Sequence, residues 1–158
     1  MKIKKRTETL TIDGTPLQTG SKIPSFHLYN RDGEKIESDT LKSGKVLISI
    51  YSDINTSVCD LQTRTLFEKA SKLGNVKVIN VSNNSIEELN DWCASAGLDV
   101  EMYSDKDLSF AKAMNLYIPE IDHLARSLYI LEDGIITYHE IVADLATEPD
   151  YESALKNL

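Results

Sequence analysis

The segment VLISIYSDINTSVCDLQTR (residues 46–64) decides the fold, because one short stretch carries two different periodicities. Residues 46–51 are almost continuously apolar, which is typical of a strand covered on both faces. From Ser57 onward the pattern is helical, and Ser57 and Asp60 form an S-x-x-D pair that resembles a capping box, with Ser57 as N-cap. A partial apolar stripe and a terminating glycine follow at Val58, Leu61, Phe67, Ala70, Leu73 and Gly74. The segment therefore predicts a buried strand that leads directly into a helix.

Cys59, one of two cysteines in the chain, lies at this junction. As the second residue of the predicted helix, it faces free backbone N–H groups and the positive end of the helix dipole, which favour a thiolate. Sites in α/β sheets are usually found where a parallel strand ends. Thr56 is placed to hydrogen-bond the sulfur or a ligand oxygen, and Arg64 either assists or faces solvent. From position alone, a reactive thiolate and a small buried apolar side chain are both open interpretations.

A second strand and helix follow at residues 76–82 and 85–97. Ser85 and Glu88 form an S-x-x-E capping box, and Gly97 ends the helix. One helical face is apolar and consists of Ile86, Leu89, Cys93 and Ala96. Cys93 therefore has a position typical of a core residue.

The ends of the chain read as hairpins and short helices. Asp-Gly pairs at 13–14, 32–33 and 133–134 predict hairpin turns. A third helix is expected over 104–116, capped near Ser104 or Asp105, and a short one over 148–158 with Pro149 in its first turn. These elements predict a single α/β domain over residues 1–158, with a mixed sheet that is parallel in the centre and antiparallel at the edges.

Charge and composition restrict the possible partners. The chain of 158 residues has a net charge of -8 and a pI of about 4.9, which argues against nucleic acid or an anionic membrane as partner. The basic start MKIKKR (1–6) is interpreted as a solvated end. Neither a signal peptide nor a membrane span is expected, so a cytoplasmic location is predicted. Thiols are mostly reduced there, so the two cysteines are either inert or chemically used.

Several other cysteine chemistries find little support. The sequence has no C-x-x-C, which excludes an ordinary thioredoxin-type dithiol, and its three histidines show no ligand spacing for a metal site. A Cys-His hydrolase would need His123 or His139 as partner. Nothing in the sequence favours either of them.

The segment NTSVCDLQTR (55–64) resembles the active-site segment of bacterial thiol peroxidases, a branch of the atypical two-cysteine peroxiredoxins. The resemblance covers nearly the whole chain in the family's order, through IDGTPLQTGSKIPSFHL (12–28), WCASAGL (92–98), SDKDLSFAKAMNL (104–116), HLARSLYIL (123–131) and TEPDYESAL (147–155). It implies a thioredoxin-like α/β fold of the peroxiredoxin type, with an extra N-terminal β-hairpin.

The resemblance also assigns roles. It implies that Cys59 is the peroxidatic cysteine and Cys93 the resolving cysteine, beside the matching Trp92. Thr56 takes the place of the threonine of the T-x-x-C motif, and Arg126 that of the catalytic arginine. The implied reaction is reduction of hydrogen peroxide and alkyl hydroperoxides through a sulfenic acid and a Cys59–Cys93 disulfide, recycled by thioredoxin. The family further implies a homodimer and no metal or organic cofactor.

One residue departs from the family pattern. Ser52 stands where peroxiredoxins carry the proline of P-x-x-x-T-x-x-C, and serine cannot reproduce its fixed φ or missing N–H. The serine could leave the thiolate wetter, the pocket less exact or the loop more mobile. A peroxide-responsive redox sensor or relay with slow turnover is therefore an alternative function. A non-catalytic binding protein is a second alternative, which the retention of all four family residues disfavours.

Overall fold

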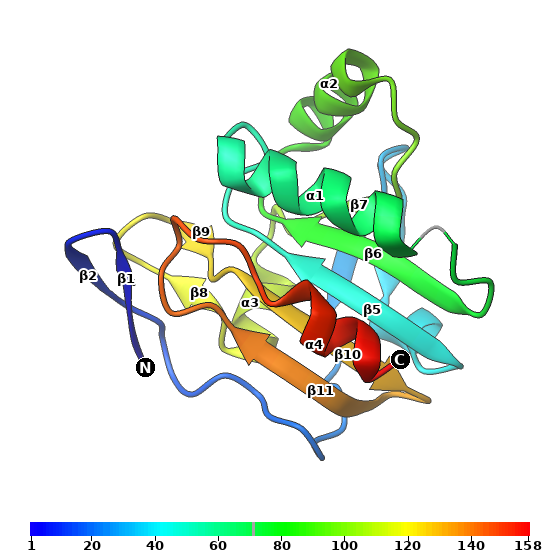
Figure 1. Cartoon of the computed structure of the whole chain (residues 1–158), viewed down its shortest axis with the longest axis horizontal. Helices are drawn as coiled ribbons and strands as arrows, with labels where there is room; N and C mark the ends of the chain where they lie inside the picture. Colours follow the sequence, from blue (N-terminus) through cyan, green and yellow to red (C-terminus); the bar gives the residue numbers. More distant parts are fainter. Residues whose placement is uncertain (71) are drawn as a thin grey trace.

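The computed structural model describes residues 1–70 and 72–158 and is built around a seven-stranded mixed sheet (Figure 1). From edge to edge the strands are β11 (Ile135–Ile141), β10 (Ser127–Glu132), β5 (Lys45–Ile50), β6 (Val76–Ser82), β7 (Met102–Ser104), β3 (His27–Tyr29) and β4 (Lys35–Glu37). β5, β6 and β7 are parallel, and the other neighbours are antiparallel. The predicted mixed sheet, with its parallel centre and antiparallel edges, is confirmed.

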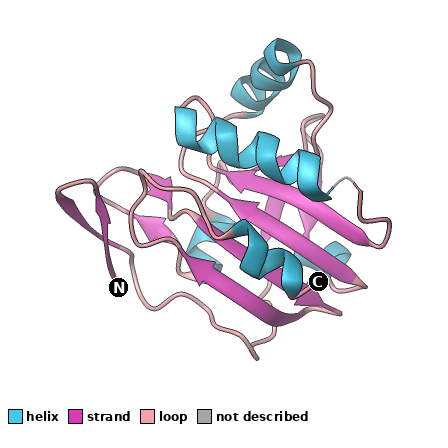
Figure 2. Ribbon diagram, viewed as in Figure 1, coloured by secondary structure: helices cyan, strands magenta, loops and turns pink. Residues whose placement is uncertain are grey.

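Helices cover both faces of this sheet. Figure 2 shows α1 (Ser57–Ala70) and α4 (Tyr151–Lys156) in front of the central strands, with α3 (Ser109–Met114) behind them. α2 (Ile86–Ala96) extends α1's layer and contacts β7. Short elements complete the chain: η1 (Ser38–Leu41), and the β8 (Tyr117–Ile118) and β9 (His123–Leu124) pair. No helix in the described ranges is long and apolar enough to cross a membrane.

β5 is buried on both faces, as its apolar run predicts. Ile48 and Ile50 belong to the large core cluster on one side of the sheet, whereas Leu47 packs with Leu66 of α1 on the other. Since side chains alternate along a strand, Ser49 and then Tyr51 point toward the α1 side. The strand thereby directs these two side chains beneath the start of α1.

The predicted apolar stripe of α1 is wrong at Leu61 and Phe67, which are 45% and 37% exposed, and is confirmed at Ala70, which is buried. The helix is described as far as Ala70, and Gly74 lies in a turn after it. The buried face instead consists of Cys59, Gln62, Thr63, Leu66 and Ala70. Polar residues can lie on this face because they are hydrogen-bonded: Gln62 Nε2 donates to Ser49 Oγ (2.8 Å), and Thr63 Oγ1 to the Cys59 carbonyl (3.0 Å).

The N-terminal hairpin forms between β1 (Lys2–Lys5) and β2 (Glu8–Thr11), but its turn is not at Asp13–Gly14. The chain reverses at Arg6, which has a φ of 58°. This conformation is uncommon for a side chain other than glycine. The Arg6 backbone N–H donates to Asp144 Oδ1 (3.0 Å), so a residue far along the chain holds the turn that the local sequence does not announce. The other two Asp-Gly hairpins form as predicted.

The helix predictions differ in accuracy. α2 has the predicted capping box and ends at Gly97 in the left-handed conformation. α3 is much shorter than predicted, because Ser104 belongs to β7. Asp105 nevertheless caps α3 from outside, accepting from the backbone N–H groups of Phe110 (2.9 Å) and Ala111 (2.8 Å). In α4 the N-cap is Asp150, so Pro149 precedes the helix instead of lying in its first turn.

Candidate active site

Cys59 lies in the first turn of α1 and is fully buried. The carbonyl of Thr56 accepts the first helical hydrogen bond, from the Asp60 N–H (3.0 Å). Thr56 therefore precedes the helix directly, one residue earlier than the predicted N-cap at Ser57. Cys59 becomes the third helical residue rather than the second, still among the free N–H groups of the helix start.

Arg126 brings a buried cation to the cysteine. It lies between β9 and β10, is only 2% exposed, and its Nη2 donates to Cys59 Sγ at 3.3 Å. Nη1 donates to Gln62 Oε1 (2.7 Å), and Nη2 and Nε both donate to the Leu145 carbonyl (2.8 and 3.2 Å). Within residues 1–70 and 72–158, the acceptors of this guanidinium are a carbonyl, an amide and a sulfur, and none of them is a carboxylate.

Gln62 is a site residue that sequence reasoning missed. Its amide orients Arg126 through Oε1 while its Nε2 is held by Ser49 Oγ and the Ile50 carbonyl. A signal was present in the sequence, because Gln62 lies three residues after Cys59 and so on the same helical face. A stripe drawn through Cys59, instead of through the apolar residues, would have included it.

Thr56 and Ser52 line a cavity of about 240 Å³ beside the cysteine. Cys59 itself is fully buried and does not line this cavity, but Arg126, which contacts its sulfur, does. The other lining residues are Lys5, Arg6, Asp53, Ser57, Val58, Ile121, His123, Leu145 and Ala146. The Thr56 hydroxyl donates to the Asp53 carbonyl (2.7 Å) rather than to the sulfur. Ser52 is buried, and its Oγ donates to the Leu124 carbonyl (2.8 Å), which connects the loop to β9. The serine thus supplies a fixed contact of a kind that proline lacks.

Cys93 lies on the buried face of α2, and its sulfur is 3.4 Å from Met102 Sδ. Both cysteines are free thiols, and both belong to one apolar cluster. The other members of this cluster are Tyr51, Ile54, Leu89, Trp92, Val100 and Met102. The structure therefore brings the two thiols into a common core without joining them.

A polar contact links the two helices that carry the thiols. Trp92 Nε1 donates to Asp60 Oδ1 (2.7 Å), and Arg64 Nε donates to Asp60 Oδ2 (2.9 Å). The Arg64 guanidinium also lies over the Trp92 ring, 5.4 Å from its centroid. Arg64 therefore supports the α1–α2 contact instead of approaching Cys59.

The three histidines all have other partners. His123 Nδ1 pairs with Asn83 Oδ1 (2.8 Å), and His139 Nδ1 with the Thr19 hydroxyl (2.8 Å). His27 Nε2 pairs with Asp107 Oδ2 (3.0 Å), which also accepts from the Tyr29 hydroxyl (2.7 Å). These contacts give no support to a Cys-His pair.

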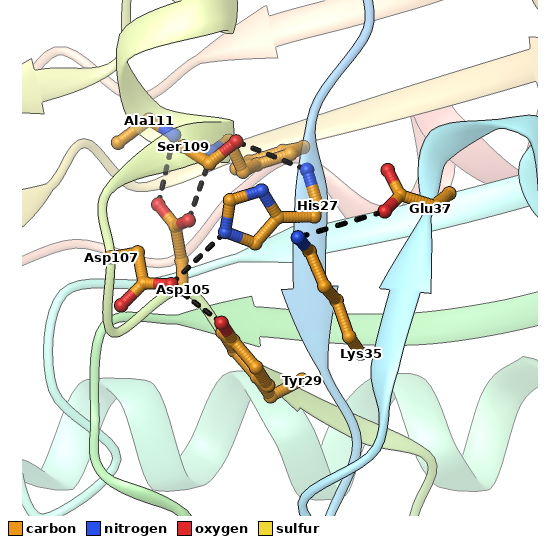
Figure 3. A network of polar contacts seen from close by, with 9 residues as sticks. His27, Tyr29, Lys35, Glu37, Asp105, Asp107, Ser109 and Ala111 are labelled. Atoms are coloured by element: carbon orange, nitrogen blue, oxygen red, sulfur yellow. Dashed lines mark hydrogen bonds and ion pairs between the residues drawn. The ribbon is translucent and has the colours of Figure 1, made fainter.

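The contacts of His27 belong to a second polar cluster, between β3 and the loop that precedes α3 (Figure 3). In it the buried Asp105 caps α3, and the exposed Asp107 is paired with His27 and Tyr29. Burial raises the pKa of Asp105 to about 7, whereas hydrogen bonds from Tyr29 and His27 lower the pKa of Asp107. Every carboxylate of this cluster has a donor.

Comparison with known proteins identifies the class to which this fold belongs. The profile of the redoxin family matches residues 18–155. A thiol peroxidase from Chromobacterium violaceum superposes with a TM-score of 0.90 at 17% identity, over 99% of this chain and 94% of that one. A peroxiredoxin-like protein from Aquifex aeolicus gives a TM-score of 0.88 at 21% identity, over 98% and 94%. The chain thus has the thioredoxin-like fold of the peroxiredoxin class of oxidoreductases, with the N-terminal hairpin that the sequence predicts.

Sequence relatives define the family more narrowly. The thiol peroxidase of Bacillus subtilis is 35% identical over 150 residues, covering 93% of this chain and 90% of that protein. That of Staphylococcus saprophyticus is 38% identical over 152 residues, covering 94% and 92%. The chain belongs to the thiol peroxidase family.

Proposed function

We propose that this chain is a thiol peroxidase that reduces hydrogen peroxide and alkyl hydroperoxides with Cys59 as its peroxidatic residue. The observation that carries the proposal is the hydrogen bond from the buried Arg126 to Cys59 Sγ, at 3.3 Å. A buried cation without a carboxylate is costly unless another anion pairs with it. A Cys59 thiolate would be that anion, placed at a helix start that further stabilises it.

In the first step the Cys59 sulfur attacks one peroxide oxygen. The S–O bond forms, the O–O bond breaks, and water or an alcohol leaves while Cys59 becomes a sulfenic acid. Negative charge spreads over the sulfur and both oxygens in the transition state, and fixed donors stabilise it. The donors around the cavity are Arg126 and the free N–H groups of the α1 start, and the Thr56 hydroxyl would join them by turning away from the Asp53 carbonyl.

In the second step Cys93 attacks the sulfenic sulfur, which gives a Cys59–Cys93 disulfide and water. A disulfide requires α-carbons within about 7 Å. The thiols start in different helices, each with its own contact, so the first turn of α1 and part of α2 are expected to unwind. Far-ultraviolet circular dichroism of reduced and oxidised protein tests this, and identical spectra would count against it.

A thioredoxin-like dithiol protein would then reduce the disulfide by thiol–disulfide exchange. The proposal includes no metal or organic cofactor. A homodimer and a cytoplasmic location remain predictions. Light scattering on the purified protein tests the first, and fractionation of cells tests the second.

The deciding experiment is peroxide consumption with thioredoxin and its reductase. We expect robust turnover that Cys59→Ser abolishes and that Cys93→Ser reduces to a single reaction per chain. Ser52→Pro serves as a comparison, because it restores the family residue at the cavity wall. If the unmodified chain consumes no peroxide and Ser52→Pro restores turnover, the peroxidase proposal fails and the redox-sensor alternative leads.

A further inference from the structure

Tyr51 is fully buried at the end of β5, next to the two thiols. Its position follows from the alternation of the strand: Leu47 and Ser49 contact α1, and Tyr51 is the next side chain on that face. It packs in the cluster that contains both Cys59 and Cys93. β5 is hydrogen-bonded on both sides, to β10 and β6, so the strand holds Tyr51 firmly beneath the two helices.

The hydroxyl group of Tyr51 has no hydrogen-bond partner in the part of the chain that the structure describes. Ser82 is close enough to lower the pKa of the phenol, but the Ser82 hydroxyl donates its own hydrogen bond to Asn84 Oδ1 at 2.8 Å. A buried polar group without a partner destabilises the folded state, and phenylalanine would fill the same place without that cost. The reduced state therefore has a buried donor that lacks an acceptor.

The chemistry next to Tyr51 creates such an acceptor. Burial raises the pKa of Tyr51 far above its ordinary value, and charge on Cys59 or Cys93 raises it further, so the phenol keeps its proton. Oxidation of Cys59 adds an oxygen atom to the sulfur in this cluster. β5 is not one of the segments expected to unwind, so Tyr51 stays on its strand beneath the sulfur of Cys59, and its protonated phenol is a donor to that oxygen.

We propose that Tyr51 donates a hydrogen bond, and then a proton, to the sulfenic oxygen of Cys59 while Cys93 attacks; this rests on the proposed function. The Cys93 sulfur forms the S–S bond, and the Cys59 S–O bond breaks with its electron pair on oxygen. Tyr51 Oη passes its proton to that oxygen, which leaves as water, and regains a proton from the Cys93 thiol. Both sulfurs end in the disulfide, and Tyr51 is unchanged.

The test separates the two steps. Reduced protein is mixed with one equivalent of hydrogen peroxide and quenched at short times, and mass spectrometry counts dimedone-trapped sulfenic acid and disulfide. We expect Tyr51→Phe to slow disulfide formation about tenfold or more, since a hydrogen bond to developing charge is lost. Sulfenic acid then persists, and excess peroxide converts more of it to sulfinic acid.

Tyr129→Phe is the matched control, because this buried tyrosine donates to the Leu17 carbonyl (2.7 Å) and lies in a different cluster from the cysteines. It should leave both steps unchanged. A solvent isotope effect on disulfide formation in the unmodified chain, absent in Tyr51→Phe, is a second readout that a packing role would not produce. Should Tyr51→Phe fail to fold, absence of that isotope effect in the unmodified chain would still overturn the inference.

Two outcomes separate this inference from the proposed function. If the unmodified chain forms no sulfenic acid at all, the proposed function fails. If it forms the disulfide normally and Tyr51→Phe forms it at the same rate, only the role of Tyr51 is overturned.

Discussion

The two polar clusters of this molecule differ in how their charges are balanced. Around Asp105 and Asp107 each carboxylate has donors, from backbone N–H groups, His27 or Tyr29. Around Cys59, among the residues that the structure describes, a buried arginine has only neutral groups and a sulfur as acceptors, and a buried phenol has no acceptor. Complete pairing is what a structural cluster needs. Incomplete pairing leaves donors ready for charge that appears only during a reaction.

Removing the positive charge of Arg126 should have the largest effect. Arg126→Met is expected to lower kcat/KM for hydrogen peroxide about 100- to 1,000-fold, because a fixed donor to the transition state is lost. Steady-state peroxide consumption measures this. The control is Arg31→Met, since Arg31 pairs with the Asp99 carboxylate and should change neither the rate nor, by more than about 1 kcal/mol, the stability. If Arg126→Met keeps a kcat/KM within tenfold of the unmodified chain, the cluster around Cys59 does not stabilise the reaction, and the proposed difference between the two clusters is wrong.

Substitutions in the cluster around Asp105 and Asp107 should lower the stability of the protein without changing its peroxide turnover. Asp105→Asn is expected to lower the free energy of unfolding by about 1–3 kcal/mol, because both oxygens of a carboxyl group, protonated or not, can accept from the two backbone N–H groups of α3, whereas an amide NH₂ cannot accept. Urea denaturation at pH 5 measures the loss. Asp107→Asn, at the exposed end of the cluster, should cost less. A drop in peroxide turnover for Asp105→Asn, at full folding, would show that the clusters are coupled.

The same carboxyl group predicts a dependence on pH. Burial raises the pKa of Asp105 from 3.8 to about 7, so the folded state binds a proton that the unfolded state has lost in this window. The contribution of this bound proton to the free energy of unfolding is fully present below pH 3.8 and is lost as the pH rises through 7. The stability difference between the unmodified chain and Asp105→Asn should therefore shrink from pH 5 to pH 8. A constant difference would contradict the assignment.

Ser52 should give the smallest effect. Ser52→Ala removes the hydrogen bond to the Leu124 carbonyl and is expected to cost about 1 kcal/mol of stability, with little change in peroxide rate. Thermal unfolding measures the loss. If Ser52→Ala changes the rate more than the stability, the serine acts on the reaction rather than on the loop.

Local patterns in the sequence predicted the elements whose causes are local. The bounds of β6 and the capping box of α2 match the structure, because apolar runs and short polar pairs specify them within a few residues. The turn at Arg6 could not be predicted, since Asp144 holds it from 138 residues away. The short α3 was missed for a related reason: Ser104 pairs in the sheet, which overrides its capping preference.

The candidate site shows the same division. The position of Cys59 at a strand–helix junction follows from its own segment, whereas Arg126 was identified only by resemblance. Its three acceptors come from residues 62, 59 and 145, and no periodicity links these positions. Gln62 was missed because a buried amide looks like a surface residue until its partner is known. The Tyr51 hydroxyl, which has no hydrogen-bond partner among the described residues, could likewise be recognised only from the structure.

The bond between Trp92 and Asp60 has a practical consequence. Trp92 is the sole tryptophan of the chain, and its indole N–H is held across the α1–α2 contact under the Arg64 guanidinium. Any movement that separates the helix of Cys93 from that of Cys59 must break this bond and wet the ring. The protein therefore contains its own fluorophore, whose emission wavelength and intensity would follow each catalytic cycle in a stopped-flow instrument without a label.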